Sequence, residues 1–199
     1  RLTGSGIDAA LISFPRYEAT LFGRAVGDFL NGRFGQLDEV APFLASLLYA
    51  GDRFESRAFL LDALADNDVV LLDRYVASNI AHQGAKVPPA ERAEFIQRVS
   101  RVEYDIFSLP RADLTLLLDL PAAAAQTLIA KKQSRSYTDR KADLQEADGT
   151  YLEQVRQVYL ELASDEPHWH RVDCLRGGTL RPVDDISEEL WAAVGSRRG

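Results

Sequence analysis

Short apolar runs alternate with longer amphipathic segments along this chain. Three such runs predict β-strands, at residues 9–14, 69–72 and 114–118, and a last strand is predicted at Arg171-Val172-Asp173. Unbroken apolar runs of this length are typical of strands that are buried on both faces, as in parallel sheets. Pro15 ends the first run, because proline has no N–H for a strand ladder.

The intervening segments repeat apolar residues at spacings of three and four, which predicts helices. They cover residues 18–30, 39–65, 76–86, 90–108, 145–163 and 185–194, with one more helix beginning at Pro121. Strands that alternate with helices indicate an α/β fold, with a parallel sheet and helices on both faces. No linker or internal repeat interrupts the pattern, so we predict a single domain over residues 1–199.

Composition narrows the class of protein. Hydrophobic residues make up 46% of the sequence and charged residues 27%, as in water-soluble globular proteins. The net charge of −7 argues against a general nucleic-acid or membrane surface. No apolar run approaches the roughly 20 residues that span a bilayer. The single cysteine, Cys174, forms no internal disulfide; this fits a reducing cytoplasm, and we expect a small buried side chain there.

The chemistry-bearing residues gather where strands end. Asp73, Arg74 and Tyr75 follow the run 69–72 directly, and Arg16 follows the first run. In open α/β sheets, ligands bind outside the carboxyl ends of the strands. These residues are therefore candidates for handling a metal ion or a phosphate. The alternative is an Asp-Arg pair that caps a helix at the surface.

Two predicted helices carry polar residues at helical spacing. Tyr49 and Arg53, beside Asp52, would suit a nucleobase, with the ring stacking and the guanidinium donating to a carbonyl. The alternative is an ordinary surface salt bridge. On the segment 76–86, four neutral polar side chains form two pairs at i, i+4, and they suit hydrogen bonds to a base or sugar. These are Ser78, Asn79, His82 and Gln83. The alternative is a solvated helix face.

A basic stretch stands out in this acidic protein. Residues 131–141 contain Arg135, Arg140 and three lysines, opposed by one aspartate. We interpret the stretch as a mobile lid over phosphates. The alternative is an exposed loop that is basic by chance.

Taken in order, these segments resemble the thymidylate kinases, P-loop enzymes that pass the γ-phosphate of ATP to dTMP. The resemblance covers nearly the whole chain, and the ordered set is more specific than any one motif. The matching stretches are Phe14-Pro15-Arg16-Tyr17, Tyr49 with Asp52-Arg53, Asp73 to Ala85, Leu109 to Asp113, the lid with Glu146, and Tyr159 to Ala163.

The resemblance implies a three-layer P-loop NTPase-like fold and assigns roles on the acceptor side. Arg16 and Tyr17 would reach the acceptor monophosphate. Tyr49 would stack on thymine, with Arg53 donating to its O4. The remaining roles follow the same resemblance: Asp73 would hold Mg²⁺, Arg74 would contact the phosphate, and Ser78, Asn79, His82 and Gln83 would line the base and sugar.

The lid would cover residues 131–147. In it, Arg135 and Arg140 would lean on the transferring phosphate, and Glu146 is the acid that follows them. His82 stands where many relatives carry a tyrosine, which bears on discrimination between ribose and deoxyribose. The resemblance also implies ATP as donor and a homodimer. The net charge and the single cysteine give the other expectations, a cytoplasmic protein with no nucleic-acid or membrane partner.

One departure from the family is an absence. A P-loop reads G-x-x-x-x-G-K-[ST], and the 199 residues contain no such run. We expect it on a strand and helix before Arg1, so we expect an incompletely represented enzyme that, as given, binds ATP poorly. Two alternatives stay open. One is another nucleotide or deoxynucleoside kinase of the P-loop superfamily, and the other is a non-catalytic dimeric module with a kinase-like fold.

Overall fold

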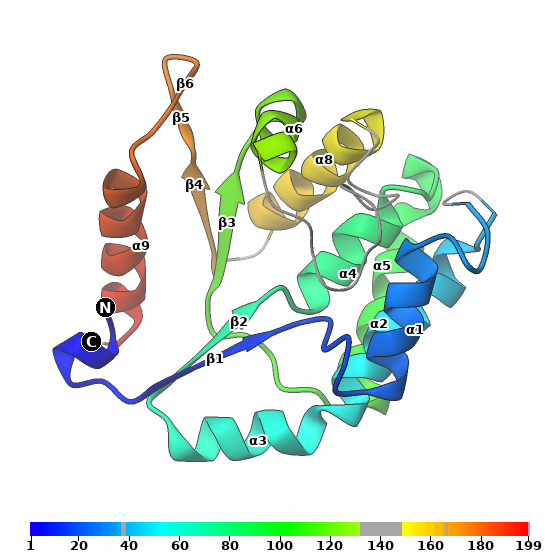
Figure 1. Cartoon of the computed structure of the whole chain (residues 1–199), viewed down its shortest axis with the longest axis horizontal. Helices are drawn as coiled ribbons and strands as arrows, with labels where there is room; N and C mark the ends of the chain where they lie inside the picture. Colours follow the sequence, from blue (N-terminus) through cyan, green and yellow to red (C-terminus); the bar gives the residue numbers. More distant parts are fainter. Residues whose placement is uncertain (37–38, 132–148, 166, 199) are drawn as a thin grey trace. The chain divides into compact units, whose positions relative to one another are not determined.

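The computed structural model describes residues 1–36, 39–131, 149–165 and 167–198. Contacts between residues divide the chain into two compact units. Unit 1 is Arg1–Pro110, and unit 2 comprises the described residues of Arg111–Lys132 and Glu146–Gly199. Each unit has strands flanked by helices (Figure 1). The single domain predicted from the sequence stays a prediction.

Unit 1 is built on two parallel strands. β1 (Ala9–Ser13) pairs with β2 (Val69–Asp73), and Ser13 lies opposite Asp73 at the carboxyl ends. The ladder continues past β1, because the Phe14 N–H donates to the Asp73 carbonyl at 3.0 Å. The predicted parallel pairing is therefore confirmed. It brings the segment after β1 and the segment after β2 to one edge.

The helices of unit 1 gather around α2 (Pro42–Glu55), which contacts α1, α4 and α5 (Figure 1). Their core contains Val26, Phe29 and Ala45. The close approach of α1 to α2 depends on Gly51, since a Cβ there would lie 2.5 Å from the ring of Phe22. The other helices are η1 (Thr3–Ser5), α1 (Leu21–Leu30), α3 (Arg57–Asp66), α4 (Val76–Gly84) and α5 (Pro89–Ser100).

The long helix predicted over residues 39–65 is wrong, because the chain forms α2 and α3 with a break at Ser56. Ser56 is fully buried, and its hydroxyl accepts a hydrogen bond from Arg16 Nη1 at 3.2 Å. The predicted helix 18–30 begins only at Leu21. There Thr20 caps α1 by accepting the Gly23 N–H at 2.8 Å.

The helix predicted over residues 90–108 also differs. After α5 the chain widens into a π-helical segment, η2 (Arg101–Ile106), and Ser108 follows with a positive φ of 50°. π-Helical segments are rare and occur frequently at functional sites. Glu103, within this segment, is fully buried.

Unit 2 has a second parallel pair, β3 (Thr115–Asp119) with β4 (Trp169–Asp173), and Asp119 lies opposite Asp173. An antiparallel hairpin that the sequence did not predict follows, with Gly177 and Gly178 at positive φ in its turn. The remaining elements of unit 2 are α6 (Ala122–Lys131), α8 (Gly149–Asp165), β5 (Leu175–Arg176), β6 (Thr179–Leu180) and α9 (Val183–Arg198).

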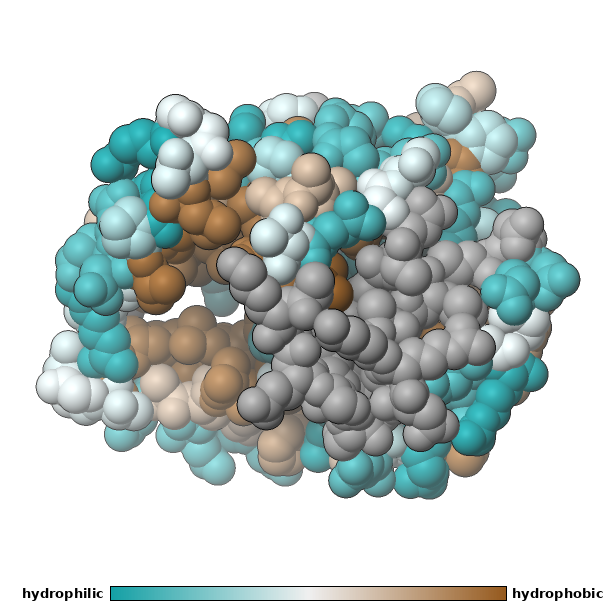
Figure 2. All heavy atoms as spheres, turned by 45° about the horizontal axis from the view of Figure 1, so that its top comes forward, coloured by the Kyte–Doolittle hydropathy of each residue, from teal (hydrophilic) through white to brown (hydrophobic). Residues whose placement is uncertain are grey.

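The predicted α/β class, with parallel strands and flanking helices, is confirmed, although the described strands pair in separate ladders. Burial on both faces is wrong for several strand positions. Leu11, Leu71 and Leu118 are 70%, 38% and 53% exposed. Leu11 and Leu71 are register partners, so their side chains lie on the same, incompletely covered face of the ladder. Hydrophobic side chains accordingly reach the surface among hydrophilic ones (Figure 2). No described helix is long and apolar enough to cross a membrane.

Candidate functional site

The turn between β2 and α4 presents a carboxylate and a guanidinium. Arg74 has a φ of +64°, a left-handed conformation that is uncommon for a residue with a side chain. Its Nη1 donates to the Ser78 hydroxyl at 3.2 Å and lies 3.1 Å from Nε2 of His82. Asp73 is exposed, and within the described chain its carboxylate has no hydrogen bond or ion pair. A free carboxylate and a cation therefore follow one another at the strand end.

The segment after β1 is held by Asp52 of α2, which is fully buried. One Asp52 oxygen accepts the Arg16 N–H at 3.0 Å, and the other accepts the hydroxyl of Thr20. The Arg16 guanidinium lies 4.2 Å from the centre of the Phe59 ring. Asp52 is therefore a positioning residue for this segment. The guanidiniums of Arg16 and Arg74 contact different helices, and their joint action on one phosphate stays a prediction.

Unit 1 contains a buried polar cluster, defined here as Ser46, Arg53, Asn79, Gln83 and Glu103. Arg53 and Glu103 form a paired, two-point salt bridge in its centre, with Nε to Oε2 at 2.9 Å and Nη2 to Oε1. Their side chains are 2% and 0% exposed. Burial opposes the charge on Arg53, but the charge and hydrogen bonds of Glu103 outweigh it, so the pKa of Arg53 is raised.

Amide groups in the buried polar cluster have unused hydrogen-bonding capacity. Asn79 Nδ2 donates to Glu103 Oε1 at 2.8 Å and to the Ser46 carbonyl at 3.0 Å. Among the described residues, however, Asn79 Oδ1 and both amide atoms of Gln83 have no partner. Each such buried group costs about 1–3 kcal/mol unless a ligand or water satisfies it. The buried polar cluster thus retains one acceptor atom on Asn79 and both amide groups of Gln83 without a partner in the described chain.

His82 lies next to this cluster and is 9% exposed. Burial, and then the positive charges of Arg74 and Lys86, lower its pKa well below the ordinary value of 6.5. Burial also lowers the pKa of Lys86 to about 8, and the Lys86 ammonium lies 5.1 Å from the centre of the Phe29 ring. His82 is therefore neutral near pH 7, and it offers hydrogen bonds without charge.

The depressed pKa of His82 predicts a loss of stability in mild acid. The unfolded chain takes up a proton at this residue below about pH 6.5, whereas the native chain does not, so unfolding becomes easier as the pH falls. Relative to His82→Gln, the native protein should lose up to about 1.4 kcal/mol of unfolding free energy per pH unit between about pH 6.5 and about pH 5.5. Urea denaturation across that range measures the difference. Parallel curves for the two proteins would contradict the prediction.

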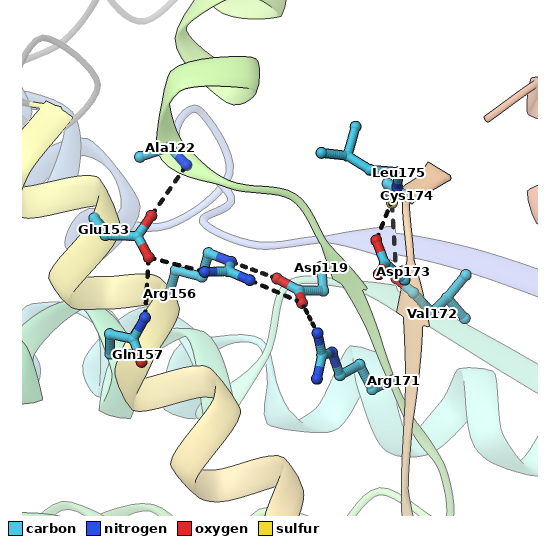
Figure 3. Close-up of polar contacts among 10 residues, drawn as sticks. All are labelled: Asp119, Ala122, Glu153, Arg156, Gln157, Arg171, Val172, Asp173, Cys174 and Leu175. Carbon is cyan, nitrogen blue, oxygen red and sulfur yellow. Dashed lines mark hydrogen bonds and ion pairs between the residues drawn. The ribbon is translucent and has the colours of Figure 1, made fainter. Parts of the chain in front are cut away.

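A second charged cluster lies in unit 2, at the carboxyl ends of β3 and β4 (Figure 3). Asp119, 2% exposed, accepts from Arg156 Nε at 2.6 Å and forms an ion pair with Arg171 Nη2 at 2.6 Å. Glu153 accepts from Arg156 Nη1 at 2.8 Å and from the Ala122 N–H at 3.2 Å. The hydrogen bond that Arg156 donates to Asp119 raises the pKa of Arg156. These contacts tie β3, β4, α6 and α8 together.

Metal-ligating groups and the cysteine thiol are the other candidates for chemistry in the described chain. No group of three or more His, Cys, Asp or Glu residues in it could hold a metal ion. Cys174 is buried and free, as predicted, and burial raises the pKa of its thiol, which lies 3.8 Å from the Val172 carbonyl (Figure 3).

Comparison with known proteins identifies the family. The family profile described as thymidylate kinase matches residues 1–180. The chain belongs to the thymidylate kinase family. Thymidylate kinase from Deinococcus radiodurans is 34% identical over 160 residues, which are 80% of this chain and 70% of that protein. The Leifsonia xyli enzyme is 30% identical over 194 residues, 96% of this chain and 83% of that protein.

A solved structure supports the fold. Thymidylate kinase from Candida albicans aligns with 99% of this chain and 84% of its own chain, with a TM-score of 0.66 and 24% identity. The expected P-loop NTPase-like α/β fold is therefore confirmed. Thymidylate kinases are phosphotransferases.

The residues to which the thymidylate kinase resemblance assigned roles differ in how deeply they are buried. Tyr49 is half-buried, edge-on to Phe29 with ring centres 6.4 Å apart. The surface salt bridge considered for Asp52 and Arg53 is wrong, since both are buried and have different partners. The solvated helix face is also wrong, because Asn79, His82 and Gln83 are buried.

Tyr17 and Ser78 were also predicted to line the acceptor site. Tyr17 is half-buried against the core around Phe29, and Ser78 is half-buried beside Arg74. The expected lid over residues 131–147, with its residues Arg135, Arg140 and Glu146, lies outside the described residues, apart from the end of α6.

Sequence reasoning missed Glu103, the partner of Arg53. A signal was present, because Phe95, Val99 and Glu103 recur at intervals of four on one helical face. Phe95 and Val99 are buried, so a carboxylate in the same row is out of place unless it has a partner. Ser46 contributes its carbonyl, and no side-chain pattern predicts such a contact.

Proposed function

We propose that this protein transfers the γ-phosphate of ATP to dTMP, with Mg²⁺, and forms dTDP. Membership of the thymidylate kinase family gives the reaction class. The observation that carries the choice of acceptor is the buried polar cluster, whose unused donor and acceptor atoms match thymine.

Thymine presents a carbonyl oxygen at position 4 beside an N–H at position 3. The hydrogen bonds of Arg53 within the described chain use Nε and Nη2, which leaves Nη1 to donate to the carbonyl. Asn79 Oδ1, buried and without a partner in the described chain, is an acceptor for the N–H. The half-buried ring of Tyr49, on the same helix as Arg53, supplies a face for stacking. Ser78, His82 and Gln83 complete the polar lining of α4.

The acceptor phosphate belongs at the strand ends. Arg74 and Arg16 supply positive charge there, Tyr17 follows Arg16 in the chain, and Arg135, Arg140 and Glu146 are assigned to the lid. Asp73 fits a Mg²⁺ site, because Mg²⁺ commonly takes one or two carboxylates together with substrate phosphates and water. When bound, the ion would neutralise charge on the transferring phosphoryl group. Phosphoryl transfer needs positioning and charge neutralisation more than covalent catalysis, and this set of residues suits it.

Acceptor binding tests the proposal without depending on ATP. Calorimetric titration of this chain with dTMP, dUMP, dCMP and thymidine should give the lowest Kd for dTMP. Thymidine should bind at least about tenfold more weakly, because it lacks the phosphate that makes charged hydrogen bonds worth about 1.5–3 kcal/mol each. Tighter binding of thymidine or dCMP would contradict the proposal.

We also place the working protein in the cytoplasm as a homodimer. Apolar side chains remain exposed on two helices of unit 1, with Leu21 at 64% on α1 and Leu44 at 60% on α2. A second copy would cover them. The mass in solution, relative to 22.1 kDa for one chain, decides between monomer and dimer.

A further inference from the structure

Glu103 has a place in this site that the family resemblance did not assign. We propose that Glu103 is the positioning residue that makes the acceptor site select thymine over cytosine. The inference rests on the proposed function. It concerns how the buried polar cluster is oriented, and not the phosphate chemistry.

Glu103 fixes the direction of the Arg53 guanidinium. Its two oxygens accept from Nε and Nη2, and this two-point geometry permits a single orientation of the planar group. The pair is almost completely excluded from water, so no solvent competes for either partner. Because Nε and Nη2 are both engaged, the nitrogen that remains for a base is Nη1. Arg53 thus offers a donor.

Glu103 also fixes the direction of the Asn79 amide. Asn79 Nδ2 lies between Glu103 Oε1 and the Ser46 carbonyl, and both of these atoms can only accept. Rotating the amide by half a turn would place Oδ1 against two acceptors. The orientation therefore follows from the chemistry of the partners, and Asn79 offers an acceptor.

The fixed pair, one donor and one acceptor, distinguishes the two pyrimidines. Thymine has the complementary order, with an acceptor at O4 and a donor at N3. Cytosine has the inverse order, an amino group at position 4 and an acceptor at N3, so both contacts would be repulsive. Buried polar groups that are left unpaired make such discrimination large. Uracil has the same edge as thymine, so Glu103 does not separate dTMP from dUMP.

The backbone at Glu103 supports a dedicated role. Glu103 lies in the π-helical segment η2, where its carbonyl accepts the Leu109 N–H at 3.1 Å. Its fully buried carboxylate lies on the same helical face as the buried side chains of Phe95 and Val99.

Replacing Glu103 by glutamine removes one acceptor and adds a donor in nearly the same volume. Where the new amide group faces Asn79, only the Ser46 carbonyl still favours the native orientation of Asn79, and an Asn79 that turns presents Nδ2 to the base. We expect the ratio of the Kd values for dCMP and dTMP to fall at least about tenfold, because one fixed hydrogen bond of this kind is worth about 1.4 kcal/mol or more. Titration of both nucleotides into native protein and Glu103→Gln measures it. The control is Glu94→Gln, the same change at an exposed residue of α5, which should leave the ratio unaltered.

Each outcome decides one question. A native protein that fails to prefer dTMP contradicts the proposed function. A native protein that prefers dTMP, with an unchanged ratio in folded Glu103→Gln, contradicts the role of Glu103 alone. If Glu103→Gln does not fold, Glu103→Asp decides, since it keeps the charge but withdraws the carboxylate by one methylene. We expect the ratio to fall in that variant too, and an unchanged ratio would overturn the inference.

Discussion

Replacing Arg53 by methionine should weaken dTMP binding by about 10- to 100-fold and lower the free energy of unfolding by about 3–5 kcal/mol. The affinity falls because the base loses a charged donor at its 4-carbonyl. The stability falls for a separate reason, since the Glu103 carboxylate, 0% exposed, is left without its countercharge. Calorimetric titration and urea denaturation measure the two effects.

Two further variants separate those effects. Arg101→Met makes the same change at an exposed arginine of η2, and it should alter neither quantity. Arg53→Met combined with Glu103→Leu removes both charges, which should restore much of the stability without restoring affinity. Undiminished dTMP affinity in the single variant would show that Arg53 has no contact with the base.

Replacing Asp119 by alanine should lower the free energy of unfolding by about 3 kcal/mol. Asp119 is the carboxylate on which Arg156 and Arg171 converge, and it is 2% exposed (Figure 3). Its loss leaves the Arg156 guanidinium, 22% exposed, with Glu153 as its partner. Arg171 is half-exposed and can be solvated, which keeps the effect from being larger. Urea denaturation followed by circular dichroism gives the value.

Asp113→Ala is the matched control, because Asp113 also belongs to unit 2 but is exposed. Its effect should stay within about 0.5 kcal/mol. A loss below about 1 kcal/mol for Asp119→Ala would mean that the charged cluster contributes no more than a surface ion pair.

Local patterns predicted the strand ends well. The run before Asp73 predicted a parallel strand, and the structure pairs it with residues 9–13 so that Ser13 lies opposite Asp73. That prediction worked because a short apolar run and the polar residues directly after it are both local features. The polar residues of α4 were also found locally, from their helical spacing.

Features that depend on partners distant in the sequence were missed. Nothing near Ser56 marks a helix break, because the hydrogen bond there comes from Arg16, forty residues away. The alternative considered for Arg53 was a salt bridge with its neighbour Asp52, yet its partner is Glu103, fifty residues on. Charges choose partners by burial and geometry in the folded chain, and sequence spacing reveals only the partners within a helix or strand.

The central claim is that the base of dTMP binds to a donor and an acceptor whose directions are already fixed by Glu103. A crystal structure of this chain with dTMP tests it most directly. The account predicts that Arg53 Nη1 donates to O4 and that Asn79 Oδ1 accepts from N3, each at about 2.7–3.2 Å. It also predicts that both hydrogen bonds from Arg53 to Glu103 persist. A base bound away from α2 and α4, or an Arg53 that has left Glu103 to reach it, would contradict the account.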